Sequence, residues 1–131
     1  MRTIFTLLLL GVFSLFGSST IEARQQVTFN VNLKPQLEDS IFVPGRDQLQ
    51  LVGNLQPINT ARPYFLTDTE PIDSVYSVTI TFPGRFRNQT LIYNFEMTVN
   101  YIKQKESLER RLLLRTGEVE LDALYFNAFA W

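Results

Sequence analysis

From Val27 to Phe126 the sequence predicts an all-β, immunoglobulin-like sandwich of about seven short antiparallel strands. Apolar and polar residues alternate with a period of two in several segments, which is the pattern of half-buried strands. Pro, Gly and Asn turn signals separate these segments every 8 to 12 residues or so. Helical periodicity is weak throughout, so no long helix is expected.

The first predicted strand begins at Val27, where apolar residues alternate with Thr and Asn. Pro35 ends it, because proline lacks a backbone donor for the strand ladder. Residues 37–47 are expected to form a loop. A second short strand is predicted over residues 49–52. The segment 56–73 holds three prolines and many polar residues, so it is predicted to be mostly loop.

The second half of the chain carries the clearest strand patterns. A brief edge strand is predicted at residues 64–66. Longer strands are predicted after it, because the aromatic and aliphatic residues of each such segment fall mainly on one face. Leu112 and Leu114 are expected to point inward, with Leu113 leaving the register of their strand open. The predicted strands are residues 76–82, 90–99, 111–116 and 119–126, with a polar connection over 103–109 and a tight turn over 116–118.

The N-terminal segment has the layout of a secretory signal peptide. Arg2 gives a positive start, residues 4–16 form an almost unbroken apolar run, and small residues follow. Cleavage after Ala23 or Ser19 fits this layout, and an uncleaved membrane anchor is the alternative. Cleavage after Ala23 leaves residues 24–131, enough for one domain and too few for two. The protein is therefore expected in the periplasm or outside the cell.

The composition argues against catalysis and against several kinds of partner. The chain has no His and no Cys, which removes the usual base at neutral pH, the thiol nucleophile and the commonest transition-metal ligands. The net charge of −1 gives no reason to expect nucleic acid or, beyond the signal peptide, a membrane as partner. No enzyme activity, catalytic residue, cofactor or metal is predicted.

Six short segments occur in the order and spacing typical of one family of binding modules. They are residues 27–31 (VTFNV), 49–54 (LQLVGN), 74–84 (SVYSVTITFPG), 93–95 (YNF), 110–111 (RR) and 124–127 (LYFN). Together they resemble starch-binding domains of the glucoamylase type and their glycogen-binding relatives, and more closely the small modules of that kind in bacterial secreted hydrolases. The resemblance implies a sandwich fold and a non-catalytic role in binding a polysaccharide or oligosaccharide.

The sequence differs from this family at the positions whose side chains bind sugar in the family. Leu55-Gln56-Pro57 stands where a Trp usually follows the Gly-Asn turn, and Tyr101 is the one aromatic residue where a second Trp is usual. Asn94 replaces a Lys, and Glu109 occupies the expected Asn position. Sugars present C–H surfaces that pack on aromatic rings. The candidate glycan contacts are therefore Tyr101, Tyr64 and Trp131.

An interaction domain without sugar binding is the alternative function. Such a domain would offer a protein partner an edge strand or the aromatic C-terminal tail. Phe129 and Trp131 either fold back over the sandwich or remain exposed for that partner. Phe86, Arg85 and Arg87, at a predicted hairpin tip, are candidate partner contacts together with Phe129, and the arginines serve equally well as charges that protect a strand edge.

Two groups of acidic residues have both a functional and a structural interpretation. Asp68, Glu70 and Asp73 have oxygen ligands suited to Ca²⁺, but they lack the spacing and turn glycine of an EF-hand loop. Residues 118, 120 and 122 alternate with apolar residues, so they are expected to form the solvated face of a strand. Neither group is predicted to hold a metal.

Overall fold

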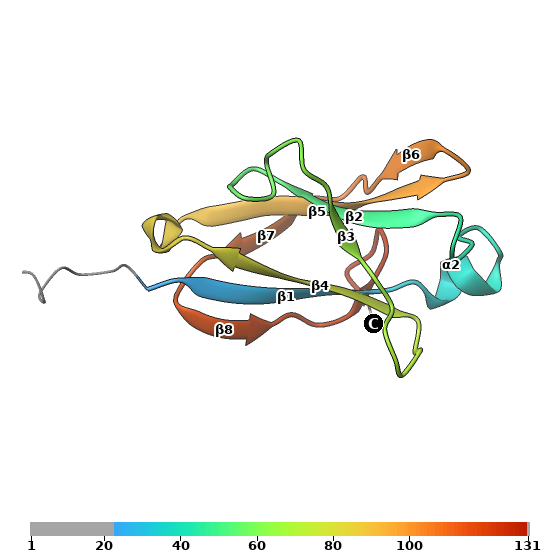
Figure 1. Cartoon of the computed structure of the whole chain (residues 1–131), viewed down its shortest axis with the longest axis horizontal. Coiled ribbons are helices and arrows are strands. Elements are labelled where there is room, and N and C mark those ends of the chain that lie inside the picture. The colour runs from blue at the N-terminus through green and yellow to red at the C-terminus, as the bar shows by residue number, and fades with distance from the viewer. Residues whose placement is uncertain (1–22, 131) are drawn as a thin grey trace, which may run out of the picture.

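Two β-sheets packed face to face make up the part of the chain that the structure, a computed structural model, describes: residues 23–130 (Figure 1). The predicted all-β sandwich is confirmed. Its elements are β1 (Gln25–Asn32), α2 (Lys34–Glu38), β2 (Gln48–Gly53), β3 (Tyr64–Leu66), β4 (Val75–Phe82), the 3₁₀ turn η1 (Gly84–Phe86), β5 (Thr90–Val99), β6 (Ile102–Lys105), β7 (Arg110–Leu113), β8 (Gly117–Glu120) and β9 (Leu124–Tyr125).

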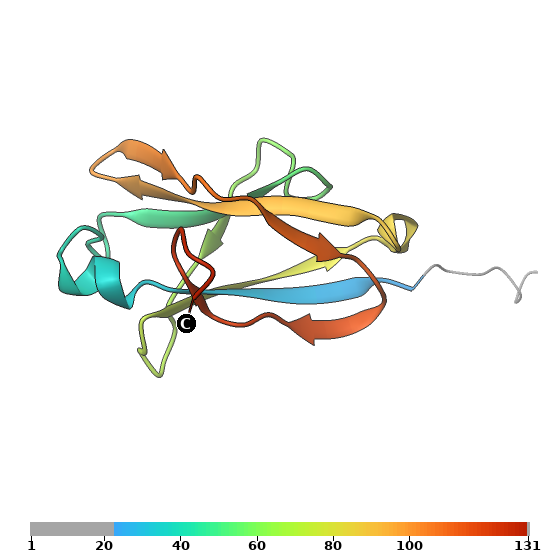
Figure 2. The ribbon, with the colours of Figure 1, turned by 180° about the vertical axis from the view of Figure 1, so that it is seen from behind.

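The first sheet is centred on β1. On one side β1 pairs antiparallel with β4, and on the other it pairs in parallel first with β8 and then with β9, as the view from behind shows (Figure 2). The sequence predicts one continuous closing strand in an antiparallel fold. Instead the strand is interrupted near Leu121, whose N–H donates to the Thr28 carbonyl and whose carbonyl accepts from the Asn30 side chain at 2.8 Å.

The second sheet has the order β3-β2-β5-β6, and β7 pairs with the first half of β5. The predicted bounds of β3 and β5 agree with the structure. Leu112 packs against the core, Leu114 is buried and Leu113 is exposed, which confirms the predicted inward pair on either side of β7's last residue. The second sheet therefore turns an apolar face to the core, while its outer face mixes polar residues with exposed apolar ones such as Phe65 and Leu113.

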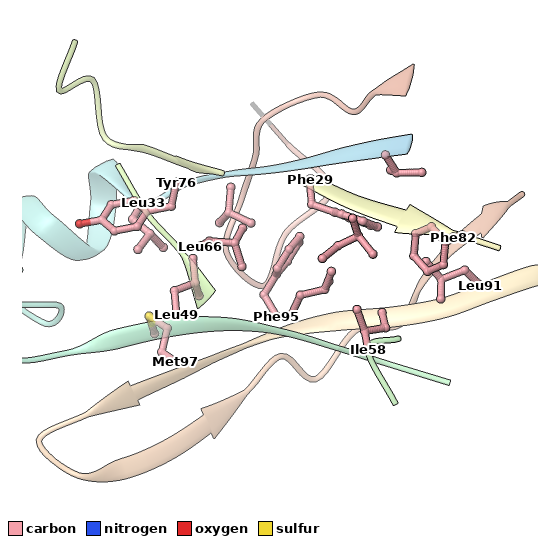
Figure 3. Packing of buried hydrophobic residues seen from close by; sticks show 14 of the residues in the cluster. Phe29, Leu33, Leu49, Ile58, Leu66, Tyr76, Phe82, Leu91, Phe95 and Met97 are labelled. Atoms are coloured by element: carbon pink, nitrogen blue, oxygen red, sulfur yellow. The ribbon is translucent and has the colours of Figure 1, made fainter. Parts of the chain in front are cut away.

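The core lies between the sheets and is rich in aromatic residues (Figure 3). Phe29, in the central strand, is completely buried and meets the rings of Phe82 and Tyr93 edge to face, at centroid distances of 6.3 and 5.0 Å. Burying each such side chain stabilises the fold by about 1.5–3 kcal/mol. Figure 3 shows Ile58, from the long loop between β2 and β3, closing one side of this core.

Two elements differ from the prediction. Residues 34–38 form the short helix α2, where Pro35 occupies the first turn and its missing N–H has no intrahelical partner to lose. Residues 102–105, expected to be part of a polar connection, form β6. Every side chain of β6 is exposed, so the strand carries no alternating pattern by which a sequence would reveal it.

The predicted signal peptide, residues 1–23, lies outside the described part of the chain except for Ala23, and Trp131 also lies outside the described part. Among the helices within residues 23–130, none has the length and apolar character needed to cross a membrane.

Candidate functional site

Tyr101 lies at the tip of the hairpin that joins β5 to β6. Asn100 and Tyr101 form its two-residue turn, and both have a left-handed backbone, with φ of 50° and 68°. This turn type suits the twist of a hairpin, but it favours Asn followed by Gly. Tyr101 is 90% exposed and the neighbouring Ile102 is 64% exposed. A large aromatic side chain thus projects into solvent from a backbone position that disfavours it.

The hairpin tip is fastened to the loop before β2 by Asp47. One carboxylate oxygen accepts the Asn100 N–H at 3.0 Å and the Arg46 Nε at 2.8 Å. The other accepts the Val43 N–H at 2.8 Å and the Arg46 Nη2 at 2.9 Å. The Asp47 side chain is fully buried. These bonds, led by those from Arg46, hold the pKa of Asp47 well below its usual range. The tip therefore has a fixed position.

A cleft of about 360 Å³ lies beside these hydrogen bonds, and Asp47 forms part of its wall. Phe65 of β3, 40% exposed, is its most accessible aromatic residue, and Tyr76 is almost entirely buried. Burial, with a smaller contribution from the charge of Asp68, raises the pKa of the Tyr76 hydroxyl. The cleft is lined by Phe42, Pro44, Gly45, Asp47, Gln48, Leu49, Phe65, Leu66, Thr67, Asp68 and Tyr76. It combines aromatic walls with hydrogen-bonding groups, the usual composition of a small-ligand site.

Tyr64 is not brought together with Tyr101. It is half-buried, with the Arg62 guanidinium 5.5 Å from its ring centre. Strand register places it opposite Leu51 and, one strand further, Phe95. Tyr101 lies near the far end of that same strand. At about 3.3 Å per residue along the strand and about 4.8 Å between strands, the two tyrosine backbones are roughly 20 Å apart.

The predicted contacts Arg85, Phe86 and Arg87 lie at the opposite end of the sandwich, in and beside η1 (Figure 1). Phe86 is half-buried and packs against the core, with the Arg85 guanidinium 4.7 Å from its ring centre. Arg85 also donates a hydrogen bond to the Gln56 side chain. Arg85 and Arg87 line a hollow of about 240 Å³ beside Asn88.

The tail before Trp131 folds back and is anchored by a buried ion pair. Arg110 bonds Glu106 through two contacts of 2.6 and 3.0 Å, and it donates to the carbonyls of Tyr125 and Ala128. Glu106 in turn accepts the Asn127 N–H at 2.6 Å. Phe129, 65% exposed, lies with its ring centre 5.6 Å from the Arg110 guanidinium.

Two of the acidic residues considered as Ca²⁺ ligands, Asp68 and Asp73, accept hydrogen bonds from backbone N–H groups of their own loop. Asp68 accepts the N–H groups of Ser74, at 2.9 Å, and Asp73, at 3.4 Å, while Asp73 accepts the Val75 N–H at 3.1 Å. Within residues 23–130 no three His, Cys, Asp or Glu side chains are grouped as metal ligands. These contacts give the carboxylates a structural role in closing the turn before β4.

Strand β4 has a free edge over its second half. Ser77 exchanges both backbone hydrogen bonds with Thr67, at 2.9 and 3.1 Å, so its N–H and C=O point away from β1. In an antiparallel pair this direction alternates, so Thr79 and Thr81 point the same way. No backbone group in the described part of the chain bonds Thr79 or Thr81 on that side. Both residues are exposed.

Sequence reasoning proposed Tyr101 as a contact residue but missed Asp47, which holds the turn that carries it. Asp47 follows a Pro-Gly turn in a segment predicted to be a loop, where an acidic residue is ordinarily solvated. Its contact with Asn100 depends on the register between β2 and β5, which the sequence does not reveal. The free edge of β4 likewise depends on which strand lies next to it.

No protein-family model and no curated protein matches this sequence.

Proposed function

We propose that this chain is an exported, non-catalytic module that binds a glycan through Tyr101. The observation that supports this best is the combination of exposure and backbone strain at that residue. A non-glycine residue in the left-handed region costs about 1–2 kcal/mol. With 90% of its surface exposed, Tyr101 recovers little of this through burial. Strained residues that the surrounding structure holds in place are typical of binding sites.

The chemistry around Tyr101 suits a sugar. A tyrosine ring offers an apolar face for the C–H groups of a pyranose and a hydroxyl at its rim. Asp47 fixes the tip that carries the ring and also lines the neighbouring cleft, where Gln48 and Thr67 supply hydrogen-bonding groups. A glycan of several units is therefore the ligand class that fits, with one unit on Tyr101 and further units toward Phe65.

Substitutions at Tyr101 separate binding from stability. Tyr101→Phe keeps the aromatic face, so it should retain affinity in gel retardation and calorimetric titration with soluble α- and β-glucans. Tyr101→Gly removes the face and relieves the strained turn, so binding should be lost while the melting temperature rises. Leu113→Ala is the matched control, because the exposed Leu113 pairs with Thr90, at the opposite end of β5 from the turn that carries Tyr101. If the wild-type protein binds no polymer, or if Tyr101→Gly binds normally, the glycan function is wrong.

Protein interaction is the second candidate function, and a separate observation favours it. The free edge of β4 exposes backbone donors and acceptors of Thr79 and Thr81 that an extended strand can bond. Its residues 78–82 read Val-Thr-Ile-Thr-Phe, with no charge, proline or glycine to discourage pairing. This mode of binding uses no residue near Tyr101.

A further inference from the structure

We propose that the free edge of β4 pairs antiparallel with the same edge of a second copy of this chain, which forms a two-fold symmetric dimer. The proposal rests on the second candidate function, protein interaction through β4, and is independent of glycan binding. In such a dimer the first sheets of the two copies join into one continuous sheet. The contact is isologous, so the same residues meet from both sides.

The free edge accommodates this pairing in one register. With Ile80 on the two-fold axis, Thr79 of each copy lies opposite Thr81 of the other, and both pairs exchange their backbone hydrogen bonds. The pairing ends beyond these residues, because Thr67 already lies opposite Ser77 and exchanges both of its backbone hydrogen bonds. Pro83 of the second copy has no N–H that would be left unbonded there.

The other strand edges are less suited to pairing. β3 has three residues and β9 has two, so neither offers a long ladder. β6 carries Lys103 and Lys105, both exposed, and lysine on an edge strand discourages strand addition. The second half of β4 is longer than β3 or β9 and carries no lysine that would discourage strand addition.

Charge complementarity favours a second copy over an unrelated strand. Arg85 and Arg87 lie just beyond one end of β4, and neither forms an ion pair within residues 23–130. The loop that carries Asp68 and Asp73 lies at the other end (Figure 1). Antiparallel self-pairing brings the arginine end of each copy against the acidic loop of the other. Because the contact is two-fold, this attraction occurs twice.

Sedimentation velocity over a range of protein and salt concentrations tests the proposal directly. The wild-type protein should dimerise in a concentration-dependent way, and salt should weaken the dimer because exposed charges are screened. Thr79→Pro removes an N–H that faces away from β1, a position where an edge strand tolerates proline. Its dimer should dissociate at least about tenfold more readily. Thr79→Lys, which keeps the backbone, should weaken the dimer as well.

Charge variants and hydrogen exchange locate the contact. Arg87→Glu should weaken the dimer, and combining it with Glu70→Arg, an exposed residue of the same acidic loop, should restore it, while Arg111→Glu on β7 is the matched control that should have no effect. The amides of Thr79 and Thr81 should exchange rapidly at high dilution and slowly in the dimer. A wild-type monomer at all concentrations, or a dimer insensitive to both Thr79 variants, overturns the proposal.

The outcomes also separate this dimer from the other functions. If the wild-type protein is monomeric and both threonine amides exchange rapidly, self-pairing is wrong while the edge remains free for another strand. If both amides exchange slowly in the monomer, the edge is covered, and the second candidate function is wrong as well. Tyr101→Gly should leave dimerisation unchanged, so loss of glycan binding and loss of pairing are read independently.

Discussion

Replacing Glu106 by Gln would test the buried ion pair that anchors the C-terminal turn. The Glu106 side chain is fully buried and that of Arg110 is 5% exposed, so water solvates neither charge appreciably. Gln at this position still accepts the Phe95 N–H that Glu106 accepts at 2.8 Å, but it provides no negative charge. The variant therefore leaves the Arg110 guanidinium buried without a counter-charge.

The expected loss is large relative to the stability of a domain of this size. Removing one partner of a buried, hydrogen-bonded ion pair costs about 3–5 kcal/mol. A typical domain has a free energy of unfolding of about 5–15 kcal/mol, so this is a substantial fraction. Small domains lose about 4–8 °C of melting temperature for each kcal/mol. Glu106→Gln should therefore lower the melting temperature by at least about 12 °C.

Thermal and urea unfolding followed by circular dichroism measure this loss, and the chain contains a matched control. Glu109 and Arg111 form an ion pair of 2.7 Å in which the two side chains are 53% and 63% exposed. Glu109→Gln should cost less than about 1 kcal/mol. Hydrogen exchange at Asn127, whose N–H donates to Glu106, should accelerate only in Glu106→Gln. Equal shifts in the two variants would refute the reasoning.

Three further predictions concern the core and Asp47, which holds the turn between β5 and β6 in place. Phe29→Ala should lower the free energy of unfolding by about 3–5 kcal/mol in urea titrations, because its buried ring leaves a cavity; a loss under 1 kcal/mol would contradict this. Gly53→Ala should cost about 1–3 kcal/mol, because the new methyl group overlaps the Ile58 Cδ1 atom, and Ile58→Val in the same chain should recover part of that loss. Asp47 has a depressed folded-state pKa, so its stabilisation is complete above the ordinary Asp pKa of about 4 and is lost as pH falls below it. Stability curves of Asp47→Asn should therefore be flatter than wild type on the acid side, and parallel curves would exclude this role.

The strands that the sequence revealed are those with one buried and one exposed face. β4 and β5 show this plainly, with residues such as Ile80 and Phe95 buried and their neighbours polar. β6 was missed because it packs on nothing: its Ile-Lys-Gln-Lys sequence is exposed throughout, and backbone pairing with β5 alone defines it. The interruption near Leu121 was missed because residues 119–126 keep a strand-like composition across it.

The candidate site was only partly accessible to the same reasoning. Tyr101 was proposed because it is the only aromatic residue in the interval where starch-binding modules, which the sequence resembles, usually have a second Trp. Its strained turn depends on where β5 ends, and its anchoring depends on a carboxylate from a loop far away in the sequence. A local pattern contains no information about either. The same holds for the free edge of β4, since strand order arises from the whole topology.

The parallel pairing of β1 with β8 and β9 has a consequence for how the protein is made. Of the strands within residues 23–130, β1 is synthesised first, and the strands that cover one of its edges are synthesised last. Until residues 117–125 have been synthesised, the first sheet is incomplete, because Val27 pairs with Val119 near the other end of the domain. Such distant contacts slow folding because the whole chain must close before they form. The native fold of residues 23–130 therefore forms only after the last strands of the domain have been synthesised.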